Sequence, residues 1–212
     1  NKELSRYSIQ GTTEQMRTFY TSAYHAALCP FVYDDADGKF RGLDKNIEQE
    51  KGFTNLTEFS LWDTYRAFPP LLNLVHQDVQ ADVANSLLAH YDKSVEKMLP
   101  FWSFGSNETW CMIGYHAASV LADMIVKDVK GFDHERAFEA MVTTAMNDHY
   151  DCLPEYRSLG YVPFDKEAES VSKTLEYAYD DYAITMAAKK LGKEKEYNYF
   201  LNRAMSYQIL YD

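Results

Sequence analysis

Apolar residues recur at spacings of three and four along most of this 212-residue chain, and this periodicity limits the fold more than any other feature. Between residues 12 and 29, for example, Met16 and Ala23 fall on one helical face. Thr12 and Gln15 form a capping box before that face, and Pro30 ends the pattern. The first helix is therefore predicted from its own start and stop signals.

Six further helices follow from the same period. They cover about residues 60–75, 78–98, 108–127, 133–149, 170–191 and 193–211. Pro69 and Pro70 lie inside the second of them and predict a kink or a break. Gly131 and Gly192 mark two of the joins. Seven helices with mostly short connections predict an all-α chain of antiparallel hairpins, and no apolar run approaches the roughly 20 residues that would cross a bilayer.

One segment interrupts the helical pattern. Residues 31–44 read as two short extended runs around Asp37-Gly38, which predicts a β-hairpin. The acidic residues Asp34, Asp35 and Asp37 superficially resemble a calcium loop, but the positions required for the first and twelfth ligands are not acidic. A solvated turn is the better interpretation.

Polar and aromatic residues cluster near the starts of alternate helices. The clusters are SLWDTYR, GSNETWCMIGYH and ESVSKTLEYAYDD, in the second, fourth and sixth predicted helices. If successive helices are antiparallel and alternate between two layers, these starts meet at one end of the assembly. Helix N-termini also present free backbone N–H groups there, which suits oxygen-rich ligands. A toroid of helical hairpins accounts for this alternation better than an open solenoid does.

The first cluster contains the residue types that bind a sugar ring. Trp62 can stack on a pyranose face, while Asp63 and Arg66 can bond its hydroxyl groups. The alternative is purely structural: Ser60 and Asp63 form a helix cap and Trp62 is a core aromatic residue. Both interpretations remain open at this stage.

The other two clusters contain further candidates. In the second, Asn107 and Glu108 lie among tryptophans, and Glu108 either faces a ligand or complements a helix dipole. His116 is more simply a core histidine with satisfied hydrogen bonds. In the third, Glu169 and Ser172 are as consistent with a capping role as with ligand binding.

The aspartates further along that helix are predicted to be structural. Asp180 and Asp181 lie about three turns into the helix, which is too far from its start for easy access by a ligand. One of them is expected to be paired in the interior and the other exposed.

Charge and cysteine content narrow the ligand class. A net charge of −11 excludes nucleic acid and anionic membranes as natural partners, and 17 tyrosines suit a ligand with both apolar and hydroxylated faces. Cys29, Cys111 and Cys152 show neither zinc-ligand spacing nor a disulfide framework, so we interpret them as buried free thiols. The sequence has no phosphate loop, nucleophile elbow or HExxH motif.

Three long motifs carry a resemblance that covers nearly the whole chain. FSLWDTYRAFPPLLNLV, GSNETWCMIGYHAASVLAD and GYVPFDKEAESVSKTLEYAYDDYAI resemble segments of glycoside hydrolase family 92, whose members are calcium-dependent exo-acting α-mannosidases. The segments DGKFRGLD and FYTSAYHAALCP are similar to that family as well. The resemblance implies an (α/α)6 toroid behind an N-terminal β-sandwich, with residues 1–212 forming the first part of the toroid.

The resemblance also implies a function for the parent protein. That function is removal of terminal α-linked mannose, often α-1,2-linked, from an oligosaccharide, with inversion and with Ca²⁺ helping to distort the sugar while an activated water attacks. It further implies a periplasmic or secreted location. The general acid, the base and the calcium ligands of the family lie beyond Asp212, so no catalytic or metal-binding residue is expected in this segment and its isolated form is expected to be inactive.

The sugar-binding candidates are therefore Trp62, Asp63, Arg66, Asn107, Glu108, Glu169 and Ser172. We expect Asp63 and Glu108 to face a shared concavity. The chain starts without Met and ends on a helical pattern, which predicts a segment cut from a longer protein, with the rest of the catalytic domain as its partner and exposed apolar surfaces where that partner packs. The alternative function is a non-catalytic carbohydrate-binding or scaffold module.

Overall fold

The computed structural model describes residues 3–49 and 52–211, and within these ranges the predicted all-α class is confirmed. The α-helices of the described residues are α1 (Thr13–Ala26), α2 (Leu61–Thr64), α3 (Phe68–Val75), α4 (Gln77–Lys93), α5 (Ala117–Val126), α6 (His134–Ala145), α7 (Leu153–Leu159), α8 (Ser170–Leu191) and α9 (Glu194–Ala204). Short 3-10 helices, η1 (Leu4–Arg6) and η2 (Met205–Leu210), lie near the two ends.

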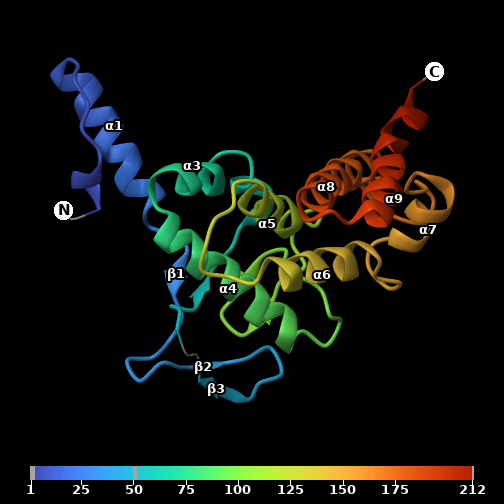
Figure 1. Ribbon diagram of the computed structural model, residues 1–212, viewed down its shortest axis with the longest axis horizontal. Helices are drawn as coiled ribbons and strands as arrows, with labels where there is room; N and C mark the ends of the chain where they lie inside the picture. The colour runs from blue at the N-terminus through green and yellow to red at the C-terminus, as the bar shows by residue number, and fades with distance from the viewer. Residues whose placement is uncertain (1–2, 50–51, 212) are drawn as a thin grey trace.

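The helices form an open arc rather than a closed bundle. In Figure 1, α1 extends away at one end, α8 and α9 lie at the other, and α5 lies between them. Helix α5 (Ala117–Val126) is the centre of the core, because eight of its ten residues are buried, and it packs against α6 and α8. Helix α8 (Ser170–Leu191) in turn packs most extensively against α9.

The first helix has the predicted capping box but no place in the core. The Thr12 side chain accepts from the Gln15 N–H, and the Gln15 side chain accepts from the Thr12 N–H. None of the residues of α1 is buried, and Tyr24 is 54% exposed. Helix α1 therefore presents apolar side chains such as Tyr24 to solvent, and their cover by another part of the protein stays a prediction.

The second predicted helix is broken, as the two prolines indicated. Helix α2 (Leu61–Thr64) is a single turn, and α3 (Phe68–Val75) restarts with Pro69 and Pro70 in its first turn. Proline is tolerated there because the first N–H groups of a helix have no intrahelical partner. The break therefore precedes the prolines, and it leaves Tyr65 and Arg66 between the two helices.

The start of the fourth predicted helix was wrong by nine residues. Helix α5 begins at Ala117, whereas residues 103–108 form a small hairpin of β5 (Ser103–Phe104) and β6 (Asn107–Glu108). Trp110, Met112 and Gly114 follow with positive φ angles of 54°, 72° and 81°. A helix cannot run through such residues, since left-handed backbone breaks the i to i−4 hydrogen bonds.

The predicted hairpin at residues 31–44 has a different pairing. Strand β1 (Phe31–Val32) pairs with β4 (Leu56–Thr57), and β2 (Lys39–Arg41) pairs with β3 (Ile47–Gln49), all antiparallel. The turn that joins paired strands is thus the one after Arg41. Asp37-Gly38 is a turn between strands of different sheets, and the exposed pair of Asp37 and Lys39 agrees with a solvated turn.

The remaining boundaries depend on local signals. The predicted helix at 170–191 is confirmed as α8, whereas α4 stops at Lys93 and α6 at Ala145, each before its predicted end. The last predicted helix divides into α9 and η2. Helix α7 (Leu153–Leu159) was missed, because seven residues are too few to display a periodicity.

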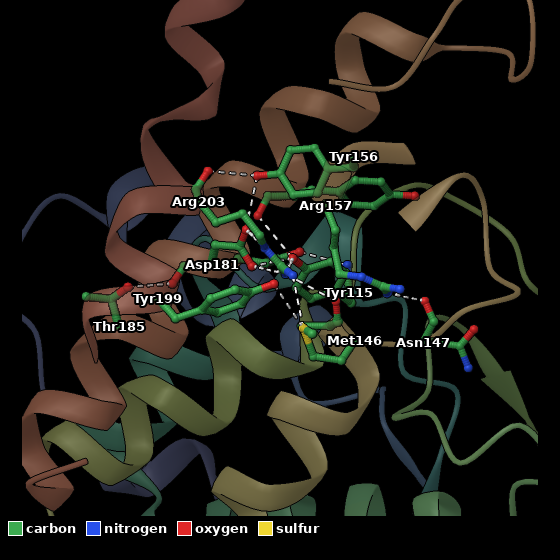
Figure 2. A network of polar contacts seen from close by, with 12 residues as sticks. Tyr115, Met146, Asn147, Tyr156, Arg157, Asp181, Thr185, Tyr199 and Arg203 are labelled. Carbon is green, nitrogen blue, oxygen red and sulfur yellow. Dashed lines mark hydrogen bonds and ion pairs between the residues drawn. The ribbon is translucent and has the colours of Figure 1, made fainter. Parts of the chain in front are cut away.

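A buried ion pair joins α8 to the C-terminal end of α9. Figure 2 shows the Arg203 guanidinium directed at the Asp181 carboxylate, with Nε 2.6 Å from Oδ2. Tyr115 and Tyr156 donate their hydroxyls to the same carboxylate at 2.7 and 3.0 Å. Asp180 is also fully buried, so the expectation that one of the two aspartates is exposed was wrong.

The cysteine interpretation also needs correction. All three cysteines are free thiols, as predicted, but Cys29 and Cys111 are exposed and Cys152 is half-buried. Apolar neighbours in the sequence do not predict that a cysteine is buried, because a loop or an unpacked helix end can turn the cysteine side chain outward. In the described ranges no helix combines the length and apolar character needed to cross a bilayer.

Candidate functional site

Three segments far apart in the sequence meet at the carboxylate of Glu176. Trp62 and Arg66 come from the α2 segment, His116 immediately precedes α5, and Glu176 lies in the second turn of α8. These are the three segments whose alternation predicted a common end. They do meet, although through Glu176 and His116 rather than through Asp63 and Glu108.

Glu176 is surrounded by donors. Its Oε1 accepts from Trp62 Nε1 and Arg66 Nη2, both at 3.3 Å. Its Oε2 lies 3.4 Å from the Tyr65 hydroxyl and 3.3 Å from His116 Nε2. The Glu176 side chain is 15% exposed, whereas that of Arg66 is 59% exposed. The carboxylate therefore lies at the inner edge of a surface that includes the half-buried Trp62 indole and the exposed Arg66 guanidinium, with the buried Tyr65 phenol beneath them.

His116 is held between two carboxylates. Its Nδ1 is 2.8 Å from Asp180 Oδ1, and the Tyr65 ring stacks on the imidazole with a centroid distance of 4.1 Å and an angle of 8°. Burial would lower the pKa of His116, but the charge and hydrogen bond of Asp180, with those of Glu176, outweigh it and raise the pKa to about 9. His116 is thus an imidazolium at neutral pH. The prediction of a satisfied core histidine described its burial but not its charge.

Glu176 stays ionised in this setting. Burial would raise its pKa, but the charge of His116 close by, supported by Arg66 and by the Trp62 N–H, outweighs that effect and lowers the pKa. An ionised carboxylate with an adjacent arginine and exposed aromatic surface is a suitable partner for sugar hydroxyls.

The candidate residues of the first motif are placed near one another but differ in their contacts. Asp63 is exposed and accepts from the Ser60 hydroxyl, and Ser60 makes no side-chain cap to the α2 backbone. The capping alternative for Ser60 therefore does not hold. Trp62 is half-buried, and the Arg66 guanidinium lies 4.6 Å from the centre of the Tyr65 ring. Of these residues, Asp63 and Arg66 are exposed to solvent.

Glu108 has an internal role that the sequence did not reveal. Its carboxylate accepts from the N–H groups of Phe101, Trp102 and Trp110 at 2.9–3.1 Å, and its side chain is only 5% exposed. His90 Nε2 lies 3.4 Å away. The Glu108 side chain therefore does not turn into an open concavity with Asp63, because its oxygens are occupied within the loop. A contact of Glu108 with sugar stays a prediction.

Glu108→Gln is expected to destabilise the protein by about 1–3 kcal/mol, because an amide NH₂ would face backbone N–H donors. Burial would raise the pKa of Glu108, but the His90 and backbone bonds lower it below the usual 4.5. A depressed folded-state pKa gives stability that is present above 4.5 and lost as the pH falls through the lower value. Urea unfolding at pH 7 and pH 4 measures both effects, with the exposed Glu139→Gln as control. Equal free energies of unfolding for wild type and Glu108→Gln would contradict this role.

The remaining candidates lie on the surface. Asn107 is exposed and accepts from Lys45 Nζ at 2.7 Å. Glu169 and Ser172 are exposed at the start of α8, and Glu169 has a left-handed backbone with φ 56°. The structure does not bring these three residues into the cluster at Glu176, and their roles stay predictions. Lys173, next to Ser172, is buried and pairs with Asp151 and Glu167.

The residues described do not form a calcium site. Within 3–49 and 52–211, no three histidine, cysteine, aspartate or glutamate side chains gather in a way that could hold a metal ion. Asp34 illustrates the reason, since its Oδ2 accepts from the Asn55 N–H and so serves the loop. The described residues thus do not fit a calcium ion.

Glu176 and His116 are the two residues that sequence reasoning missed as site residues. Glu176 lies in the quoted motif TLEYAYDD, but its importance depends on contacts with residues 110 or more positions earlier. A signal existed in the i, i+4 spacing of Glu176 and Asp180, which places both on one helix face toward a single histidine. The sequence could not show which histidine that was.

Comparison with known proteins identifies the group to which this arrangement belongs. A family model described as the glycosyl hydrolase family 92 catalytic domain matches residues 1–212. The structure of the family GH92 alpha-mannosidase BT3965 from Bacteroides thetaiotaomicron is 75% identical, with a TM-score of 0.98, and covers 100% of this chain and 29% of that one. The same protein has been solved with mannoimidazole.

Two more distant relatives agree. The family GH92 inverting mannosidase BT2199 from Bacteroides thetaiotaomicron is 33% identical, with a TM-score of 0.90, over 100% of this chain and 30% of that one. A protein of Arthroderma benhamiae called an uncharacterized secreted glycosidase is 28% identical over 92% of this chain and 22% of its own length. The chain thus spans less than a third of these relatives, and it belongs to glycosyl hydrolase family 92 as part of that family's catalytic domain.

Proposed function

We propose that the parent of this chain removes terminal α-linked mannose from mannosides or N-glycans, and that residues around Glu176 hold part of that sugar. The observation that carries the proposal is the convergence of Trp62 and Arg66 on Glu176, across 110 or more residues of sequence. The cluster around Glu176 suits a sugar because it combines aromatic surface with charged hydrogen-bonding groups.

Names of relatives support the finer assignment. One relative is called an alpha-mannosidase, and its complex contains mannoimidazole, while another is called an inverting mannosidase. We therefore infer inverting hydrolysis. The preference for α-1,2-linked mannose is proposed from the family resemblance of the sequence motifs alone. Because a fungal relative is called secreted, we also propose a secreted or periplasmic location.

We propose that this chain is the first part of the toroid and that the rest of the parent completes it. The general acid, the base and the calcium ligands are assigned to that remainder, together with an N-terminal β-sandwich.

Within the chain, we assign sugar contact first to the α2 segment. Trp62 supplies the stacking surface, Asp63 an exposed carboxyl group that accepts hydrogen bonds, and Arg66 a donor fork. Bonds to charged groups contribute roughly 1.5–3 kcal/mol each, enough to fix the orientation of a mannose ring. Asn107, Glu108, Glu169 and Ser172 are assigned secondary contacts.

The purified parent is expected to release mannose from α-1,2-mannobiose, with β-mannose as the first product seen by proton NMR and with activity lost in EDTA and restored by Ca²⁺. The 212-residue chain alone is expected to release none, because it lacks the proposed catalytic carboxylates. Retention of the α-anomer, or turnover by the chain alone, would contradict this assignment. Binding without hydrolysis by the parent would favour the non-catalytic carbohydrate-binding module instead.

A further inference from the structure

We propose that Asp180 and His116 act as positioning residues that hold the Glu176 carboxylate at the edge of the sugar site. The inference rests on the proposed function and extends it to residues that do not themselves touch the sugar. It starts from a continuous line of polar contacts that runs from the core between α5 and α8 outward to Glu176.

The inner end of this line is rigid. Asp180 is fully buried, and its Oδ2 accepts from the Tyr115 N–H at 2.7 Å while its Oδ1 is 2.8 Å from His116 Nδ1. Two donors from consecutive residues thus fix both oxygens. Burial raises the pKa of Asp180, and the charge and hydrogen bond of His116 together with the Tyr115 N–H oppose that rise. The ion pair between Asp180 Oδ1 and His116 Nδ1 places the Nδ1 proton between the two residues.

The middle of the line, the His116 ring, is tightly enclosed. Tyr65 stacks on the imidazole, and Gly114 approaches it so closely that a Cβ there would lie 2.5 Å from Nε2. The His116 side chain is 1% exposed, so the ring has no alternative rotamer in solvent. Its Nε2 is therefore fixed in direction, and it points toward the Glu176 carboxylate 3.3 Å away.

The protonation of His116 decides whether this contact attracts or repels. With Nδ1–H committed to Asp180, a neutral ring would direct an Nε2 lone pair at Glu176, whereas the imidazolium directs N–H. The Nε2 atom makes an ion pair but no well-aligned hydrogen bond with Glu176 in this structure.

Glu176 in turn organises the sugar-facing residues. One oxygen holds Trp62 Nε1 and Arg66 Nη2, and the other faces Tyr65 and His116. Loss of the His116 charge frees the carboxylate to rotate, and the indole and the guanidinium then lose their common acceptor. The effect on the sugar is indirect, which distinguishes a positioning residue from a catalytic one.

The charged and titratable groups around the ring come from two elements, α8 and the α2 segment. Asp180 and Glu176 face it from α8 with negative charge, and Tyr179 lies edge-on at 6.3 Å. Tyr65 stacks from the α2 side, with Arg66 beyond it. The carboxylates dominate, so His116 remains protonated through neutral pH and loses its proton near pH 9.

The test compares His116→Phe with Asp180→Asn in the parent. Phe preserves the stack on Tyr65 but removes both polar contacts, so we expect kcat/KM on α-1,2-mannobiose to fall about ten- to a hundredfold, mainly through KM. Mannoimidazole affinity measured by calorimetry is expected to fall by a similar factor. In Asp180→Asn the amide can donate to Nδ1, so a neutral Nε2–H ring still bonds Glu176 and the loss is expected to stay below about tenfold.

The pH dependence supplies a readout that a purely structural role would not move. A raised folded-state pKa gives stability that is present below about 6.5 and lost as the pH rises through 9. The melting temperature of the wild type is thus expected to drop between pH 7 and pH 10 by more than that of His116→Phe. Mannoimidazole affinity is expected to weaken over the same range in the wild type only.

His134→Phe is the matched control, because His134 is a half-buried histidine at the start of α6 whose Nε2 bonds the Val129 carbonyl. It is expected to lose stability without a change in mannoimidazole affinity. Wild-type kcat/KM and affinity in His116→Phe would overturn the positioning role. If the wild-type parent does not cleave mannosides, the proposed function fails, whereas a missing difference in the pH dependence of melting would overturn the Asp180–His116–Glu176 contact itself.

Discussion

Arg203→Met is expected to lower the free energy of unfolding of the parent by about 3–5 kcal/mol, the largest stability effect we expect from a single change in this chain. The substitution leaves the Asp181 carboxylate in the core without its cation. Asp181 is fully buried, and the Arg203 side chain is 6% exposed, so water cannot replace the lost partner. Arg203 also packs on the rings of Tyr156 and Phe200, which methionine replaces only in part.

The measurement is urea or thermal unfolding of the variant beside two controls. Arg136→Met removes an exposed ion pair with Asp92 and is expected to cost less than about 1 kcal/mol. The double variant Asp181→Leu/Arg203→Met removes both charges and is expected to recover part of the loss. A cost below 1 kcal/mol for Arg203→Met would show that the pair in Figure 2 does not secure α9 to α8.

Sequence periodicity was sufficient to predict this helical packing but not its polar centre. The 22 residues of α8 were predicted with both ends correct, because apolar spacing and Gly192 agree there. That Asp180 and Asp181 are both buried could not be read from the sequence, because each needs a partner supplied by another helix. His116 and Arg203 are those partners, and they lie 64 and 22 residues away.

The same limit explains the error at Glu108. Its sequence context, SNETW, is typical of a helix start and therefore predicts a helix that begins near Glu108. The structure instead uses its carboxylate to bind three backbone N–H groups of a loop that contains left-handed residues, among them Trp110. In the predicted helix start and in the observed loop alike, the Glu108 carboxylate binds free backbone N–H groups. Only the three-dimensional path of the chain shows which N–H groups these are.

Glu176→Gln is expected to lower kcat/KM on α-1,2-mannobiose by about ten- to a hundredfold, as large a loss of activity as that expected for His116→Phe. The amide keeps the size of the side chain, but it cannot accept from Trp62, Arg66 and His116 together, since one of its two ends is a donor. The variant also removes the negative charge that pairs with His116. Steady-state kinetics of the parent measures the loss, and the melting temperature separates it from unfolding.

The matched control for this variant is Glu139→Gln, an exposed glutamate of α6, which is expected to leave kcat/KM unchanged. A Glu176→Gln enzyme with wild-type kcat/KM would mean that the three motifs meet at a structural junction and not at a sugar site. A loss in both kcat/KM and stability, equal in free energy, would point to the same conclusion.

The binding of mannoimidazole to the parent, measured by calorimetry, tests the central claim most directly, because it reports on the sugar site without requiring catalysis. The ligand is one that a 75% identical relative holds in its crystal structure. We predict that the wild type binds it and that Asp63→Asn and Glu176→Gln each weaken the affinity by about tenfold or more, with melting temperatures close to the wild type. Equal affinities in wild type, Asp63→Asn and Glu176→Gln would contradict the account.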